Sequence, residues 1–257
     1  MNNNKEEIKF IKINMYDNWY IQEFEDDFQT GSLKYILEHM LIIFENIFGH
    51  DIMCKEICYV YNNDYFPFPQ IQYTEPLSIR LSVKGTEYWS NVIYQLSHEL
   101  CHYALRQSNC KSDKEDCLKW FEETMCEALS LYVLDLFIDT WDDCLLSRIN
   151  KTYCDSIKKY LEDICDNEIT YGLAKCKTLD DLNVINDNSE EDRIDRRNER
   201  NIIYNLFRKN PNEIFHIKDY QKYRENNGLL IDFNKWIEVE GNSNFIKEIS
   251  KIQPKVS

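Results

Sequence analysis

The chain has 257 residues, of which 43% are hydrophobic and 14% aromatic, so it is long enough to bury one sizeable core. Six glycines and five prolines are few for this length, which favours long helices over a turn-rich β architecture. A formal net charge of −15 argues against binding to nucleic-acid phosphates, so we expect no nucleic-acid partner.

Ten cysteines could indicate a disulfide framework, but the start of the chain argues against it. The first ten residues, MNNNKEEIKF, are polar and lack the apolar segment of a signal peptide. No apolar run approaches the length that crosses a bilayer. We therefore expect a cytoplasmic protein that does not associate with membranes and whose cysteines are reduced thiols.

The first 106 residues predict strands and helices together. A helix over 33–48 has one wide apolar face, with Ser32 as its expected N-cap and Gly49 at its end. Residues 77–83, LSIRLSV, alternate as a half-buried strand does. This strand is a candidate edge strand that could pair with an extended peptide, although an interior strand fits the pattern equally well. The other expected elements are strands at 8–15 and 56–61 and a helix at 89–106.

After residue 106 the sequence predicts helices only. A helix over 118–137 has one apolar face, and Glu123 and Glu127 lie four residues apart on another. Residues 166–200 are rich in charges of both signs, which predicts a solvated segment. Further helices are expected at 144–164, 202–207, 214–223 and 233–249. The chain is thus predicted to be one α+β domain, with a sheet-containing lobe at 1–106 and a helical lobe at 107–257.

The helix predicted at 89–106 contains the string His98-Glu99-Leu100-Cys101-His102. A spacing of four residues places the imidazoles of His98 and His102 on the same helix face, about one turn apart. Two neutral imidazoles in this arrangement can bind one zinc ion, and Glu99 can act as general base towards a metal-activated water. The simpler alternative is that all three are ordinary boundary residues of a packed helix.

A zinc ion that hydrolyses a substrate needs a third protein ligand. HELCH followed by the helical string EALS, which starts at Glu127, resembles the gluzincin branch of the zincin metallopeptidases, the group of thermolysin and alanyl aminopeptidase. The resemblance covers about residues 77–136. It implies a zincin-like fold, zinc bound by His98, His102 and Glu127, and hydrolysis of a peptide or protein substrate with Glu99 as general base. Glu123 is the rival for the third ligand, or an outer partner of an imidazole N–H.

The sequence can also be matched to the motifs of other zinc and iron proteins. The metzincin pattern HExxHxxGxxH fails, because Leu105 and Asn109 hold the positions of its glycine and last histidine. A ferritin-like di-iron protein is an alternative, since residues 99–102 and 213–216 are both ExxH motifs. A zinc-binding interaction protein without catalysis is another. For the side chain that stabilises the oxyanion, the sequence offers Tyr132, Tyr153, Tyr171 and His216 and favours none of them.

Overall fold

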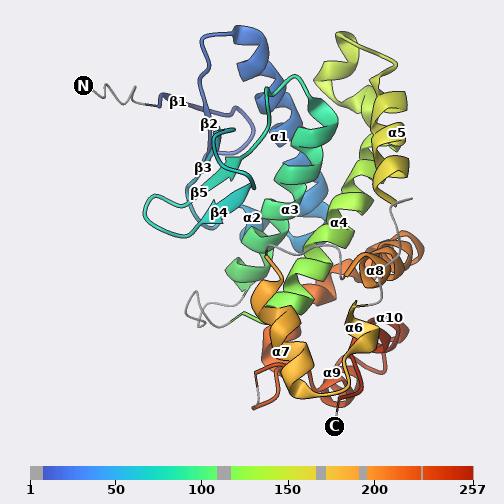
Figure 1. The fold of residues 1–257 in the computed structure, drawn as a ribbon. Coiled ribbons are helices and arrows are strands. Elements are labelled where there is room, and N and C mark those ends of the chain that lie inside the picture. The colour runs from blue at the N-terminus through green and yellow to red at the C-terminus, as the bar shows by residue number, and fades with distance from the viewer. Residues whose placement is uncertain (1–7, 109–116, 166–171, 191–195, 227, 257) are drawn as a thin grey trace.

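The structure is a computed structural model, which describes residues 8–108, 117–165, 172–190, 196–226 and 228–256. A five-stranded sheet occupies the N-terminal part, and helices make up the remainder (Figure 1). The predicted α+β class is therefore confirmed. Its zincin-like character stays a prediction.

The sheet has the strand order β1-β2-β3-β5-β4. Strands β2, β3 and β5 run parallel, while the outer strands β1 and β4 are antiparallel to their neighbours. Ile21, Val60 and Ile79 are register partners on adjacent strands and have no exposed surface. They form one row of the apolar face of the sheet. The strands are β1 Phe10–Lys12, β2 Trp19–Gln22, β3 Cys58–Asn62, β4 Gln70–Gln72 and β5 Ser78–Leu81.

The edge of the sheet nearest the later helices is β4. Of the two positions that the sequence left open for residues 77–83, the structure shows the interior one, because β5 lies between β3 and β4. The sequence analysis did not predict β4, because Pro67 and Pro69 precede it. Both prolines stand before the first strand residue, where neither removes a hydrogen bond from the ladder.

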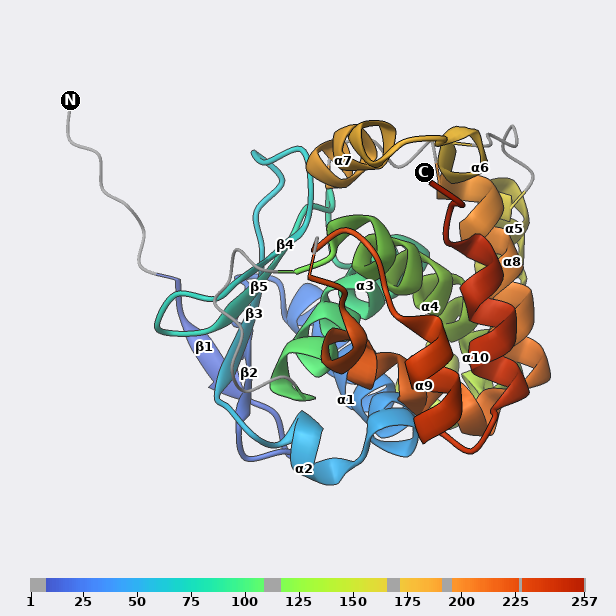
Figure 2. The same cartoon turned by 90° about the horizontal axis from the view of Figure 1, so that it is seen from below.

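The three long helices are α1 Asp27–Phe48, α3 Trp89–Ser108 and α4 Lys119–Asp139. Helices α1 and α3 pack against the sheet, and α4 packs against α3. Seen from below, α3 and α4 lie in the middle of the molecule, between the sheet and the C-terminal helices (Figure 2). Helix α1 begins earlier than predicted, because Asp26 and not Ser32 is its N-cap. Ser32 is buried inside the helix and accepts a hydrogen bond from Nε1 of Trp89 at 2.9 Å.

The remaining helices are short and surround α3 and α4. The predicted helix at 214–223 is part of a 3-10 helix, and the charged segment before residue 200 is partly buried instead of solvated. Arg196, Glu199 and Arg200 are at most 4% exposed. The elements are α2 His50–Met53, η1 Trp141–Asp143, η2 Leu145–Arg148, α5 Tyr153–Cys165, α6 Gly172–Lys175, α7 Leu179–Asn188, α8 Arg197–Lys209, η4 Pro211–Tyr223, α9 Phe233–Val239, α10 Asn244–Ile249 and η5 Ser250–Ile252.

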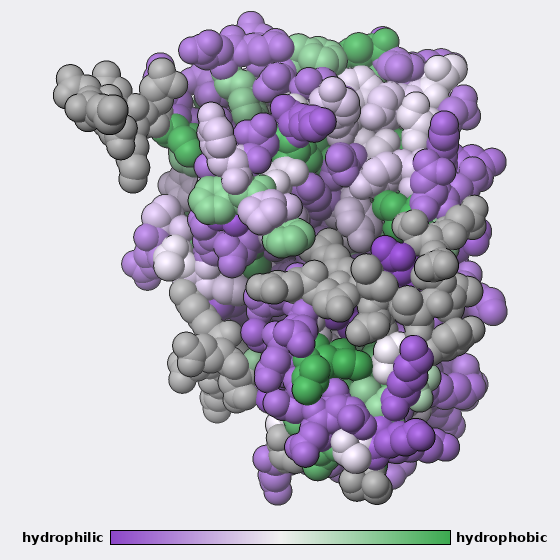
Figure 3. All heavy atoms as spheres, in the orientation of Figure 1, coloured by the Kyte–Doolittle hydropathy of each residue, from purple (hydrophilic) through white to green (hydrophobic). Residues whose placement is uncertain are grey.

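The surface drawn in Figure 3 is mixed, with hydrophobic side chains in small separate groups among hydrophilic ones. In the part of the chain that the structure describes, no helix combines the length and the apolar content needed to cross a membrane. The cysteines of that part are all free thiols. The cytoplasmic location stays a prediction.

Candidate metal centre

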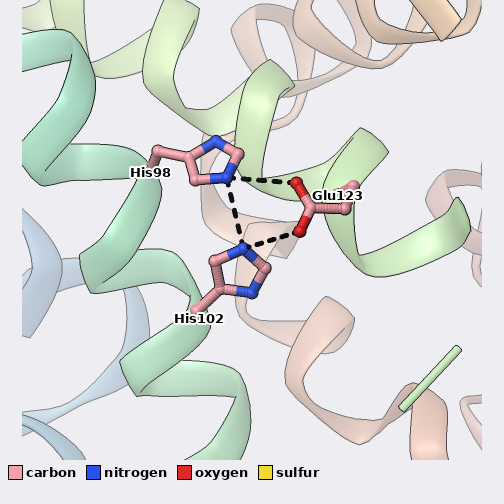
Figure 4. Close-up of side chains that lie close together, drawn as sticks. All are labelled: His98, His102 and Glu123. Atoms are coloured by element: carbon pink, nitrogen blue, oxygen red, sulfur yellow. Dashed lines mark hydrogen bonds and ion pairs between the residues drawn. The ribbon is translucent and has the colours of Figure 1, made fainter. Parts of the chain in front are cut away.

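Helices α3 and α4 pack against each other and carry three side chains that point towards one another (Figure 4). His98 and His102 project from α3, and Glu123 projects from α4. The two Nε2 atoms of the imidazoles are 3.2 Å apart. Glu123 places Oε2 at 3.2 Å from His98 Nε2 and Oε1 at 3.3 Å from His102 Nε2. Within the described ranges, these residues form the one group of three side chains that could hold a metal ion.

The separations in this cluster fit a small tetrahedral cation. Zinc binds nitrogen and oxygen ligands at about 2.0–2.1 Å, so two ligands at a tetrahedral angle lie about 3.3 Å apart. The measured 3.2 Å between the imidazoles therefore requires no movement of the helix that carries both. Two imidazoles and one carboxylate are also a donor set of catalytic zinc sites, in which a fourth position is left for water or substrate.

Glu122 holds the ring of His102 from its other side. Its Oε1 lies 2.8 Å from His102 Nδ1, and an ionised carboxylate can only accept, so the Nδ1–H donates. The hydroxyl of Tyr220, on η4, donates to the second oxygen of Glu122, and Gln221 donates to Tyr220 at 2.5 Å. With Nδ1 engaged in this way, Nε2 is the nitrogen that presents its lone pair to a metal.

Glu127 does not face the imidazoles. Its Oε1 lies 3.3 Å from Nη2 of Arg196, and neither side chain has any exposed surface. The structure thus brings together His98, His102 and the rival candidate Glu123, and it pairs Glu127 with a buried guanidinium. The two glutamates are one helical turn apart, about 5.4 Å along the axis. The sequence favoured Glu127, but which glutamate meets the imidazoles depends on how α3 and α4 pack against each other.

The charged side chains of the cluster shift one another's pKa values. Burial lowers the pKa of His102, but the charge of Glu123 and hydrogen bonds to Glu122 and Glu123 outweigh burial and raise this pKa well above its usual value. Burial raises the pKa of Glu123, but the charges and hydrogen bonds of His102 and His98 reverse the effect and hold this pKa well below its usual value. In metal-free protein, the pair is therefore an imidazolium and a carboxylate.

A cavity of about 660 Å³ opens beside the cluster, and both Glu99 and Tyr73 line it. Glu99 accepts a hydrogen bond from the backbone N–H of Ile71, on β4, at 2.7 Å. The guanidinium of Arg106 lies 3.7 Å from the centroid of the Tyr73 ring. Burial and the charges of Glu122 and Glu99 raise the pKa of Tyr73 well above its usual value, although Arg106 opposes them. The phenol therefore keeps its proton at neutral pH.

The sequence-based candidates for the oxyanion donor lie elsewhere. Tyr132, Tyr153 and His216 do not line this cavity, and Tyr171 lies outside the described residues. The second ExxH motif is also not part of the cluster. Its Glu213 accepts a hydrogen bond from Ser243 at 2.7 Å, and Nδ1 of its His216 lies 3.4 Å from Glu240. The described residues thus do not assemble the paired ExxH motifs of a di-iron site.

Tyr73, Glu122 and Tyr220 are the residues of the site that the sequence analysis missed. The alternation Gln70-Ile71-Gln72 was the available signal for β4, which brings Tyr73 to the cavity. Glu122 directly precedes Glu123 in sequence. Like Glu123, it could have been considered as an outer partner that accepts a hydrogen bond from an imidazole N–H. Tyr220 carries no local signal, because it reaches Glu122 only through the tertiary packing of η4 on α3.

Comparisons of the chain with protein-family models, with curated proteins and with solved structures find no match. No family is therefore assigned on those grounds. The geometry of the cluster and of its cavity is the basis for the functional proposal.

Proposed function

We propose that the protein is a zinc-dependent metallopeptidase with His98, His102 and Glu123 as metal ligands. The observation that carries the proposal is the close approach of two imidazoles and one carboxylate. The two Nε2 atoms are 3.2 Å apart, and a different oxygen of Glu123 lies 3.2–3.3 Å from each. These separations suit a tetrahedral zinc ion, and the cluster lies beside a cavity with a further carboxylate in its wall. Zinc, when bound there, would polarise the scissile carbonyl and lower the pKa of an attacking water.

Glu99 is the proposed general base. It follows the ligand His98 directly in sequence and lines the cavity. The hydrogen bond from the Ile71 N–H holds its carboxylate at the cavity wall. Glu99 would take the proton of the attacking water and transfer it to the leaving amine.

Tyr73 is the proposed donor to the oxyanion. Its hydroxyl makes no hydrogen bond within the described part of the chain, so its proton is available to a ligand. Arg106 stacks on the ring at 3.7 Å, which restricts the ring's orientation. A preorganised donor of this kind stabilises the transition state because negative charge develops on the carbonyl oxygen only as the reaction proceeds.

Substitution of Glu99 by glutamine tests the proposal. We expect the wild-type protein to bind about one zinc ion per chain and to cleave peptides in a random library, with cleavage read by mass spectrometry. Glu99→Gln should keep the zinc and lose about 10²–10⁴-fold in rate, because the base is removed and the ligands are not. His98→Ala is the matched control, and it should lose both zinc and hydrolysis.

The outcomes separate this proposal from its alternatives. Unchanged hydrolysis in Glu99→Gln would contradict the assigned base. Wild-type protein that binds zinc but cleaves no peptide would instead support a zinc-binding interaction protein. Two iron ions per chain in place of zinc would support the di-iron alternative.

A further inference from the structure

One cation in the cavity has no carboxylate beside it. Arg80, on β5, lines the same cavity as the metal cluster and is only 8% exposed. Its Nη2 donates to Gln70 Oε1 at 3.3 Å and to the carbonyl oxygen of Phe68 at 3.5 Å, both longer than a typical hydrogen bond. The guanidinium carbon lies 3.8 Å from the centroid of the Phe66 ring. Across the described ranges, no Asp or Glu forms an ion pair with it.

This environment leaves much of the guanidinium unsatisfied. An arginine has five N–H donors, and the protein acceptors here are one amide and one carbonyl. The Nε of Arg80 is buried and makes no hydrogen bond to any described residue. Burial of a charge without an opposite charge is costly. Arg196, another buried guanidinium, faces Glu127, and Lys119, another cation of this cavity, is paired with Glu190 at 2.9 Å. Arg80 therefore differs from both.

Arg80 and the proposed catalytic base, Glu99, line the same cavity. Arg80 is the register partner of Gln70 on β4, and the next residue along β4, Ile71, donates its N–H to Glu99. A single peptide that lies in this cavity can therefore contact both side chains.

We propose that Arg80 binds a carboxylate of the peptide substrate. This inference rests on the proposed peptidase function. A carboxylate would supply the missing opposite charge and accept N–H donors of the guanidinium in a charge-assisted hydrogen bond. The carboxylate can belong to an aspartate or glutamate side chain or to the C-terminus of the peptide, because both present the same two acceptor oxygens.

Matched peptides test the proposal through catalysis. In one arm, a glutamate placed at each position near the scissile bond is compared with glutamine. In the other arm, a free C-terminus is compared with an amide. For at least one of these pairs, wild-type protein should cleave the carboxylate form about tenfold or more faster in kcat/KM, since a hydrogen bond to a charged group contributes about 1.5–3 kcal/mol. The arm that shows the preference identifies the source of the carboxylate.

Variants then assign the preference to one side chain. Arg80→Gln should reduce the ratio between the two peptides of a pair to about one, because the neutral amide cannot distinguish charge. Lys119→Gln is the matched control, since Lys119 lines the same cavity but is already paired, and this variant should keep the ratio. Equal cleavage of both members of every pair by wild-type protein would overturn the proposal without any variant. An unchanged ratio in Arg80→Gln would also overturn it.

A binding measurement separates failure of this proposal from failure of the proposed function. The same peptide pairs are titrated into zinc-loaded Glu99→Gln protein, with and without Arg80→Gln. We expect the carboxylate peptide to bind about tenfold or more tightly than its amide counterpart only where Arg80 is present. If no peptide is cleaved but this difference is measured, the peptidase function fails and the carboxylate site stands. If peptides are cleaved and bound with no such difference, the carboxylate site fails alone.

Discussion

Glu123 and Glu127 are one turn apart on α4 and face different partners. Glu123 meets two imidazoles, and Glu127 meets a guanidinium. The distinction matters for function because a carboxylate that already contacts a fully buried arginine can turn to a metal only by giving up that ion pair.

Substitutions at these two positions should therefore have different effects. Glu123→Ala removes a proposed ligand, so we expect loss of zinc, measured as metal content after dialysis. Glu127→Gln should keep zinc but lower the free energy of unfolding, because the buried guanidinium of Arg196 loses the charge of one carboxylate. Denaturant unfolding measures this change. If Glu123→Ala kept zinc and folded Glu127→Gln lost it, Glu127 and not Glu123 would be the third ligand.

Tyr73→Phe isolates the phenolic hydroxyl from the ring. The variant keeps the ring on which Arg106 stacks, so zinc content and folding should not change. If the hydroxyl donates to the oxyanion, kcat should fall by about 10²–10³-fold with little change in KM, because the interaction forms only in the transition state. Steady-state kinetics with a cleaved peptide measures this split. A rise in KM at constant kcat would show that Tyr73 binds the ground state instead.

At the scale of secondary structure, α1 contains a buried serine, Ser32, whose position in the sequence wrongly suggests a helix N-cap. Asp26 is exposed and accepts a hydrogen bond from the N–H of Phe28 at 2.8 Å, so it is the N-cap of α1. Ser32 resembles a cap in sequence, since a serine before an apolar periodic stretch usually begins a helix. Its hydroxyl instead joins α1 to α3 through Trp89.

Two alanine substitutions separate these roles. Asp26→Ala should cost about 1 kcal/mol of stability through the lost cap, which is about 2–4 °C in Tm for a protein of this size. Ser32→Ala should cost about 1–3 kcal/mol, because the buried indole N–H of Trp89 loses its acceptor. Thermal unfolding of both variants provides the comparison. An Asp26→Ala protein with unchanged Tm would show that α1 does not depend on this cap.

The sequence predicted the elements whose signals are local. The apolar periodicity of α3 and α4 and the spacing of His98 and His102 all lie within single helices, and the structure contains those helices. The features that were missed depend on tertiary contacts. The choice between Glu123 and Glu127 depends on how two helices pack against each other. The burial of Arg196, inside a charged string, depends on the position of Glu127. Strand β4 has only three residues and is defined mainly by its pairing with β5.

At the scale of the whole molecule, the cavity is where the sheet meets the helices. β4 contributes one wall, α3 contributes His98, Glu99 and His102, and α4 contributes Glu123. η4 lies against α3 and provides Tyr220 to Glu122. Metal binding at this junction should therefore stabilise the fold as a whole, since the ligands come from two helices whose packing the ion would strengthen.

The shifted pKa values of His102 and Glu123 predict how the stability of metal-free protein depends on pH. The pKa of His102 is raised above 6.5 in the fold, so its pairing stabilises metal-free protein below that value, and the stabilisation is lost as pH rises through the raised pKa. The pKa of Glu123 is lowered below 4.5, so its contribution is present above that value and is lost as pH falls through the lowered pKa. These two groups should thus stabilise metal-free protein most at weakly acidic pH.

Zinc binding must displace the proton from His102, because a ligating imidazole is neutral. Below the raised pKa of His102, the apparent affinity for zinc should therefore fall about tenfold for each unit of pH lost. Calorimetric titrations in buffers of different ionisation enthalpy should show release of about one proton at neutral pH. His102→Ala protein lacks a proposed ligand and should bind little zinc, so it gives the baseline of the titration without binding at this site. An affinity that stays constant from pH 7 to pH 6 would mean that zinc does not replace a proton in this cluster, and that His102 is not a ligand.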